Sequence, residues 1–163
     1  MADILVTWYS RSGSTEAVAR ALAVRLGADA RPLLTSASYA GTGGFVRGVW
    51  DSLRRRGPEV SIDADPAAYR LVVVGAPIWA GKPAAPLRTF LRRHGPRAKA
   101  VAAFCLSGSG GPYPAAFAEI EDIVGSRLVA TLSLAQNEVT GGDLGAVLDE
   151  FARELRGLQP MAA

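Results

Sequence analysis

The chain has 163 residues, a net charge of +3 and a hydrophobic fraction of 49%. This length fits one domain over residues 1–163 and can bury a core without disulfides or structural metals. The hydrophobic fraction excludes a disordered chain, and no apolar run is long enough to span a bilayer. Cys105 is the single cysteine, which excludes an intrachain disulfide, and the start Met1–Asp3 lacks the basic segment of a signal peptide. We therefore expect a cytoplasmic protein with no membrane insertion.

The positive charge comes from arginines, because only Lys82 and Lys99 of the 18 basic residues are lysines. The arginines cluster at 54–56 and 92–93, near the ends of expected helices, where cations interact favourably with the helix dipole. A nucleic-acid surface is the alternative interpretation. No groove-reading motif and no basic segment interleaved with aromatic residues supports it, so we expect no nucleic-acid partner.

Apolar runs and helical patterns alternate in the first half of the chain. The run 3–9 (DILVTWY) predicts a strand, and 15–26 predicts a helix that ends at Gly27. A short strand at 29–34 contains Pro32, which favours an edge position. After a loop at 35–44, a helix that stops at Gly57-Pro58 has an apolar face that we expect to lie in the core: Phe45, Val49, Trp50 and Leu53.

The second half of the chain repeats the alternation, and its most apolar run, 70–76 (RLVVVGA), predicts a central strand. The helix that follows contains Leu87 and ends at His94-Gly95-Pro96. The remaining expected elements, in chain order, are a strand at 98–106, a helix at 114–124, a strand at 128–134 and a helix at 144–155.

Five strand–helix units follow from this alternation, and the strands lack an apolar–polar period, which indicates burial on both faces. We predict an α/β protein with three layers, α/β/α, around a five-stranded parallel sheet in strand order 2-1-3-4-5. Ligands bind such sheets at the carboxyl ends of the strands, where the order reverses. The loops that reach this point are 10–15, 77–82 and 107–114.

The first loop combines hydroxyls and a glycine at the expected start of a helix, where free amides and the helix dipole attract anions. Its candidate ligand-binding residues are Ser10, Arg11, Ser12, Gly13, Ser14 and Thr15. The loop predicts a phosphate site, although it is neither a Walker A loop nor a Gly-x-Gly-x-x-Gly motif. Plain helix capping is the alternative, and it would explain one or two of the hydroxyls.

The second and third loops offer a flat wall for a ligand. Trp79 presents an aromatic ring at the end of a central strand, although semi-buried packing would also explain it. Tyr113 either lies against a ligand ring or is exposed at the rim. The candidate residues here are Pro77, Ile78, Trp79, Ala80, Gly81, Ser107, Gly108, Ser109, Gly110, Gly111 and Tyr113. A phosphate site facing a flat wall fits a mononucleotide with a broad ring, best of all FMN.

These loops resemble those of the flavodoxin family. The phosphate signature Ser/Thr-x-Ser/Thr-Gly-x-Thr matches at Ser10, Ser12, Gly13 and Thr15. The segments 72–91 and 104–111 are more narrowly similar to the short, single-domain flavodoxin-like proteins of bacteria. The resemblance implies the flavodoxin-like fold and non-covalent binding of FMN.

The chain departs from the acidic members of that family, because loops 77–82 and 107–114 contain no carboxylate and one cation, Lys82. Carboxylates beside a flavin raise the energy of its anionic reduced form, so their absence has the opposite effect. Our hypothesis is a less negative reduction potential than that of an acidic flavodoxin.

The function that these features favour is electron transfer through FMN, with a redox partner protein or a small acceptor such as a quinone. The alternatives are an FMN-dependent NAD(P)H:quinone-type reductase and a flavodoxin-like binding or regulatory module that lacks flavin. We name no catalytic residue, because the cofactor would carry the chemistry. No His/Cys cluster predicts a metal site. We expect His94 to be a solvated cation at a helix end and Cys105 to be a buried, inert thiol.

Overall fold

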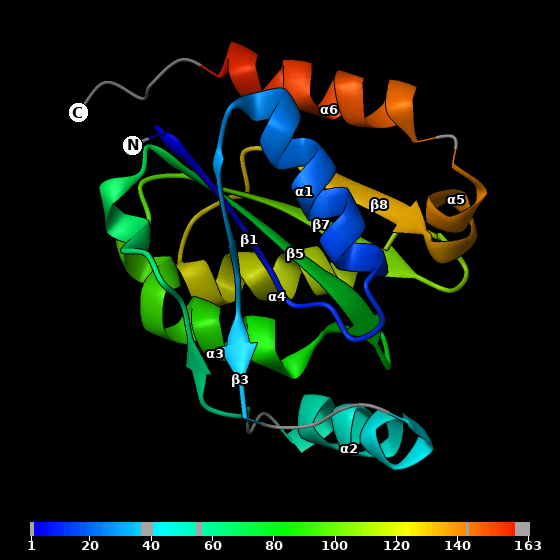
Figure 1. Ribbon diagram of the computed structural model, residues 1–163. Helices are drawn as coiled ribbons and strands as arrows, with labels where there is room; N and C mark the ends of the chain where they lie inside the picture. The colour runs from blue at the N-terminus through cyan, green and yellow to red at the C-terminus, as the bar shows by residue number, and fades with distance from the viewer. Residues whose placement is uncertain (1, 37–40, 55–56, 143, 159–163) are drawn as a thin grey trace.

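Five parallel strands form the central sheet of the computed structural model, which describes residues 2–36, 41–54, 57–142 and 144–158. The strands are β1 (Ile4–Trp8), β2 (Asp29–Pro32), β5 (Leu71–Trp79), β7 (Val101–Ser107) and β8 (Thr131–Ala135). They lie in the order β2-β1-β5-β7-β8, which confirms the predicted order 2-1-3-4-5 (Figure 1).

Helices cover both faces of the sheet, which confirms the three layers (Figure 1). The helices α1 (Ser14–Leu26) and α6 (Gly145–Gly157) lie on one side, and α3 (Ala85–His94) and α4 (Pro114–Val124) lie on the other. The central strands β1, β5 and β7 contribute to two cores: in β1, Val6 packs with residues of α1 and α6, whereas Leu5 packs with residues of α3 and α4. This two-sided burial explains the continuous apolar runs. None of the described helices is long and apolar enough to cross a membrane.

The strand ends differ from the sequence-based expectations. The predicted strand 29–34 divides, because β2 ends at Pro32 and the N–H of Leu33 donates to the carbonyl of Trp8 at 2.8 Å. Its last residue begins β3 (Leu34–Thr35), which pairs antiparallel with β4 (Val60–Ser61). Within the described residues β2 pairs with β1 alone, so Pro32 lies at an edge, as its missing N–H predicts.

Short elements that lack a periodic signal were not predicted. They are β6 (Lys82–Pro83), α5 (Gln136–Gly141) and 3-10 turns at Pro66–Ala68 and Gly95–Arg97. The turn at Gly95–Arg97 delays the start of β7 to Val101. Such elements are too short for a pattern of period two or 3.6 to emerge.

The helix α2 (Gly41–Arg54) corrects one expectation about the core. It lies at the periphery of the molecule (Figure 1), where it contacts α3 and β5, because α3 and α4 already cover that face of the sheet. Trp50 is 53% exposed and Val46 62%, so the prediction that Trp50 lies in the core is wrong. The side chains of Phe45, Val49 and Leu53 lie outside the described part of the structure.

Candidate functional site

The three predicted loops meet at the carboxyl ends of β1, β5 and β7, where the strand order reverses. They enclose a cavity of about 240 Å³. Its lining consists of Arg11, Ser12, Ser14, Thr15, Pro77, Ile78, Trp79, Leu106, Ser107, Gly108 and Gln136. Since ligand pockets usually measure about 300–1,000 Å³, this cavity would enclose part of a mononucleotide and leave the rest at the rim.

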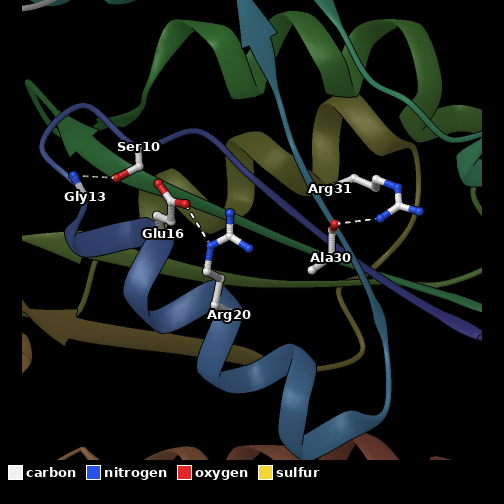
Figure 2. Close-up of polar contacts among 6 residues, drawn as sticks. All are labelled: Ser10, Gly13, Glu16, Arg20, Ala30 and Arg31. Atoms are coloured by element: carbon white, nitrogen blue, oxygen red, sulfur yellow. Dashed lines mark hydrogen bonds and ion pairs between the residues drawn. The ribbon is translucent and has the colours of Figure 1, made fainter.

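The first loop leaves the N-terminus of α1 open. Gly13 has a φ of 97°, and its N–H donates to Oγ of Ser10 at 3.0 Å (Figure 2). Among the described residues no side chain caps α1, whose first helical bond runs from the N–H of Ala17 to the carbonyl of Gly13. The amides of the first turn therefore remain available to an anion at the cavity.

Glu16, the acid in the first turn of α1, would repel an anion bound there. Arg20 lies one helical turn further along α1, and its Nε donates to Oε1 of Glu16 at 2.8 Å (Figure 2). Arg20 also lies over the ring of Trp8, 5.4 Å from the ring centroid. The ion pair of Arg20 with Glu16 is exposed and weak, but the positive charge of Arg20 offsets the negative charge of Glu16 next to the first loop.

The second loop is a β-hairpin, which corrects the expectation of an irregular loop at 77–82. The last residues of β5 pair antiparallel with β6, Ile78 with Pro83 and Trp79 with Lys82. Ala80 and Gly81 form the turn with φ values of 51° and 75°. Two positive φ values match a type I′ turn, which fits the twist of the strands. A non-glycine residue in this conformation costs about 1–2 kcal/mol, so Ala80 stores strain beside the cavity.

Trp79 both packs in the core and lines the cavity. Its side chain is 5% exposed, and its ring meets that of Tyr9 edge to face, with centroids 5.6 Å apart and an interplanar angle of 83°. Burial also raises the pKa of the Tyr9 phenol, against the opposing effect of Arg11. The packing fixes the orientation of the indole and leaves only a small part of it for a ligand.

Hydroxyls hold the third loop in place. Oγ of Ser107 accepts the N–H of Gly110 at 2.9 Å, and the hydroxyls of Ser109 and Tyr113 lie 2.6 Å apart. Hydrogen bonds from Ser107 and Ser109 lower the pKa of Tyr113. Gly110 has a φ of 68°, and a Cβ there would lie 2.4 Å from Cβ of Ala135. Only glycine therefore lets this loop close against the end of β8.

The predicted residues divide between the cavity wall and the turns that shape it. Those on the wall are Arg11, Ser12, Ser14, Thr15, Pro77, Ile78, Trp79, Ser107 and Gly108. The others do not line the cavity: Ser10, Gly13, Ala80, Gly81, Ser109, Gly110, Gly111 and Tyr113. Ser10, Gly13 and Gly110 instead fix the paths of the first and third loops.

Gln136 and Leu106 are wall residues that the sequence analysis missed. Nε2 of Gln136 donates to Oγ of Ser14 at 3.4 Å, which links the end of β8 to the first loop. Gln136 directly follows the apolar run of the fifth strand. The rule that found the other loops, a polar residue at the carboxyl end of a parallel strand, would also have found it.

The wall carries little charge. Of the described residues that line the cavity, Arg11 is the one with a charged side chain, and no carboxylate is among them. Lys82 lines a different hollow, of about 650 Å³, next to α3 and α4. Its Nζ lies 3.5 Å from Oε2 of Glu119. Lys82, the one cation of loops 77–82 and 107–114, therefore does not line the candidate cavity.

Other hollows in the molecule are wider, but they lack the convergent loops. One of about 580 Å³ lies beside β3, β4 and α3, where Leu34, Val60 and Arg93 contribute to its wall. Its lining includes no residue of the loops 10–15, 77–82 and 107–114, which follow β1, β5 and β7. The smaller cavity at the strand-order reversal is therefore the candidate site.

The single cysteine, Cys105, and the single histidine, His94, do not line the candidate cavity. Cys105 is 1% exposed, which confirms the buried thiol, and burial raises its pKa to about 12, which disfavours the reactive thiolate. His94 stacks on Phe90 with centroids 5.1 Å apart, and burial, Arg93 and Arg97 lower its pKa. The prediction of a solvated cation is wrong for His94. In the described ranges no group of three His, Cys, Asp or Glu side chains could hold a metal ion.

Comparisons with known proteins show the fold. No protein-family model and no curated protein sequence matches the chain. A flavoprotein from Lactobacillus acidophilus, solved in complex with FMN, has 23% identity and a TM-score of 0.68 over 86% of this chain and 98% of its own. A flavoprotein from Bacteroides uniformis has 19% identity and a TM-score of 0.75 over 93% and 98%.

A third solved structure, the two-electron reduced flavodoxin of Megasphaera elsdenii, has 18% identity to this chain. Its TM-score is 0.58 over 93% of this chain and 96% of its own. Together with the sheet order, these likenesses establish the flavodoxin-like fold for the chain.

Proposed function

We propose that this chain binds FMN non-covalently in the carboxyl-edge cavity and transfers electrons through it. The observation that carries the proposal is the convergence of three loops on one cavity where the strand order reverses. The complex of the Lactobacillus acidophilus flavoprotein with FMN, on the same fold, supports it. FMN supplies the redox chemistry when bound, and the protein supplies binding, orientation and electrostatics.

The phosphate of FMN fits the N-terminus of α1. The uncapped amides of the first turn and the hydroxyls of Ser12, Ser14 and Thr15 are donors suited to phosphate oxygens. The guanidinium of Arg11 adds a positive charge to the same wall. Gln136, bonded to Oγ of Ser14, orients that hydroxyl.

The ring of FMN fits between the hairpin and the third loop. Ile78 and Trp79 provide an apolar surface that excludes water, and the Ser107–Gly108 segment provides backbone amides and carbonyls. The hairpin turn and the Ser107 bond hold both walls in place before a ligand arrives, which reduces the ordering cost of binding.

The charge of the wall supports a less negative reduction potential than that of an acidic flavodoxin. With Arg11 and no carboxylate on the described wall, the negative charge that reduction adds to the cofactor meets little repulsion. Spectroelectrochemistry of the FMN-loaded protein tests this point. A potential as negative as that of the acidic flavodoxins would contradict it.

Titration of the flavin-free protein with FMN tests the proposed function. We expect one FMN per chain with a dissociation constant at or below about 1 µM, or about −8 kcal/mol, together with quenching of the flavin fluorescence. A matched titration with riboflavin, which lacks the phosphate, measures how much the phosphate contributes to the binding free energy. Undiminished fluorescence across the FMN titration would contradict the proposal and favour a binding module that lacks flavin.

A turnover assay separates an electron carrier from an NAD(P)H:quinone-type reductase. The FMN-loaded protein is mixed with NADH or NADPH and a quinone, and oxidation of the nicotinamide is followed by absorbance. For a carrier we expect the flavin to accept electrons from chemical reductants, without steady-state oxidation of the nicotinamide. Sustained turnover would assign the chain to the reductases.

A further inference from the structure

A partly buried ion cluster lies directly behind the hairpin wall. It consists of Arg88 in α3, Glu119 in α4 and Lys82 in β6. Nη2 of Arg88 lies 2.7 Å from Oε1 of Glu119, and Nζ of Lys82 lies 3.5 Å from Oε2 of the same carboxylate. One carboxylate therefore meets two cations, one on each oxygen.

The burial of the cluster makes Glu119 its essential member. The side chain of Arg88 is 2% exposed, that of Glu119 is 21% exposed, and that of Lys82 is 35% exposed. Removing one member of a buried ion pair typically costs about 3–5 kcal/mol, because the other charge stays buried without compensation. Exposed pairs contribute only about 0.2–1 kcal/mol. The ion pair of Glu119 with Arg88 is therefore the stronger of the two, and the contact of Glu119 with Lys82 is weaker and partly screened by solvent.

Lys82 connects this cluster to the candidate site. It pairs with Trp79 across the hairpin, directly beside the strained turn at Ala80. The next rung is a hydrogen bond from the N–H of Ala84 to the carbonyl of Pro77 at 3.0 Å. β5 contributes Pro77, Ile78 and Trp79 to the cavity wall, whereas the side chain of Lys82 on β6 points to the helices.

We infer that Glu119 is a positioning residue: through Lys82 and Arg88 it fastens the hairpin to α3 and α4 and so sets the cavity wall formed by Pro77–Trp79. A hairpin with a two-residue β6 has few bonds of its own to maintain a strained turn. The ion pairs supply the missing restraint from the side opposite the cavity. The consequence for FMN affinity rests on the proposed function, whereas the restraint on the hairpin does not.

Amide hydrogen exchange of the flavin-free protein tests the restraint. The variant Lys82→Met removes the surface half of the cluster and leaves the Arg88–Glu119 pair intact. We expect the amides of residues 79–84 to exchange about threefold faster, or ~0.6 kcal/mol at 1.4 kcal/mol per tenfold, while β7 keeps its protection. Lys82→Arg should restore the slow exchange. Arg92→Gln is the control, because Arg92 is an exposed cation of the same groove.

The variant Glu119→Gln should give the larger effect, at least about tenfold faster hairpin exchange, because it releases both cations. If this variant does not fold, Lys82→Met carries the test. Unchanged exchange in Lys82→Met, or equal acceleration in Arg92→Gln, would overturn the inference, whether or not the protein binds flavin.

FMN affinity gives the second readout. In Lys82→Met we expect the dissociation constant of FMN to rise about threefold and the midpoint of urea unfolding to fall only slightly, with Lys82→Arg and Arg92→Gln at the wild-type values. Faster hairpin exchange with unchanged affinity would overturn the link to the cavity wall. A wild-type protein that binds no FMN would instead refute the proposed function, and the exchange result would still decide the restraint.

Discussion

The helix ends at the two edges of the sheet differ in how their backbone groups are capped. At the amino edge the helix ends are closed: α1 and α4 finish at Gly27 and Gly125, with φ values of 60° and 80°. The N–H of Gly125 donates to the carbonyl of Glu121 at 2.8 Å, and Asp65 caps the 66–68 turn by accepting the N–H of Ala67 at 3.1 Å. Backbone groups at this edge are thus satisfied within the chain.

At the carboxyl edge three helices begin without such closure, whereas at the start of α5 the N–H of Ala135 donates to Oε2 of Glu138 at 2.7 Å. Gly13, Ala84 and Tyr113 precede α1, α3 and α4, and in the described chain none of the three helices has a side-chain cap. A side-chain cap contributes about 0.5–2 kcal/mol, so this edge gives up stability that the other edge keeps. The difference indicates that the amino edge is built for stability, whereas the carboxyl edge keeps its donors for a ligand.

The largest effect that would separate the two roles is expected for Gly110→Ala in the third loop. A Cβ at this position meets Ala135, and the residue has a positive φ, so both crowding and strain apply. We expect the free energy of unfolding to fall by about 2 kcal/mol and FMN affinity to fall at least tenfold. Gly111→Ala is the control, since its Cβ would meet no atom within 4 Å. Equal effects of the two variants, measured by urea unfolding and FMN titration, would contradict this account.

A matched pair of glycines sharpens the comparison between the edges. Gly13 and Gly125 both have a positive φ and open space around a Cβ. We expect Gly13→Ala and Gly125→Ala each to lower the free energy of unfolding by about 1 kcal/mol, because both adopt the left-handed conformation. FMN affinity should fall about tenfold in Gly13→Ala alone. Loss of affinity in both variants would show that strain at either edge reaches the site.

Gln136 gives a smaller effect that stays at the carboxyl edge. Its bond to Ser14 is 3.4 Å long and exposed, so it contributes little to stability. We expect Gln136→Ala to weaken FMN binding about threefold and to leave the free energy of unfolding unchanged, by titration and urea unfolding. Asn137→Ala is the control, because Asn137 follows Gln136 in α5 but does not line the cavity. Equal loss in the control would remove Gln136 from the site.

The smallest effect is expected at the amino edge, where His94 makes stability depend on pH. Burial, Arg93 and Arg97 lower its pKa, and Asp65 opposes them. The unfolded chain therefore takes up the proton first as the pH falls through about 6.5, so the contribution of neutral His94 to stability is lost on acidification. In His94→Phe, which keeps a ring against Phe90, we expect a weaker loss of stability between pH 8 and 5, as measured by urea unfolding. An identical pH profile would contradict this role for His94.

The sheet order and the three loops followed from the sequence because each rests on a strong local signal. Buried parallel strands have continuous apolar runs such as 70–76. The ends of α1 and α4 adopt a left-handed conformation that favours glycine, and Gly27 and Gly125 stand there. The hairpin at 77–83 did not follow, because its turn places an alanine, Ala80, in a conformation that usually requires glycine.

Other parts of the site depend on tertiary contacts that no local pattern reports. Lys82 does not line the cavity, because its ammonium group lies beside the carboxylate of Glu119. Glu119 is 37 positions further along the chain, so no local pattern indicates this contact. The environment of His94 did not follow from the sequence, because its burial depends on tertiary packing and Asp65, which acts on its pKa, lies outside α3. The position of Trp50 depends on which helices already cover the sheet.

The central claim is that the carboxyl edge holds FMN with its phosphate at the N-terminus of α1. Isothermal calorimetry with FMN and with riboflavin, which lacks the phosphate, tests it most directly. The account predicts that the flavin-free protein binds FMN at least about tenfold tighter than riboflavin, or 1.4 kcal/mol. Equal affinities for the two flavins, or no heat with either, would contradict it.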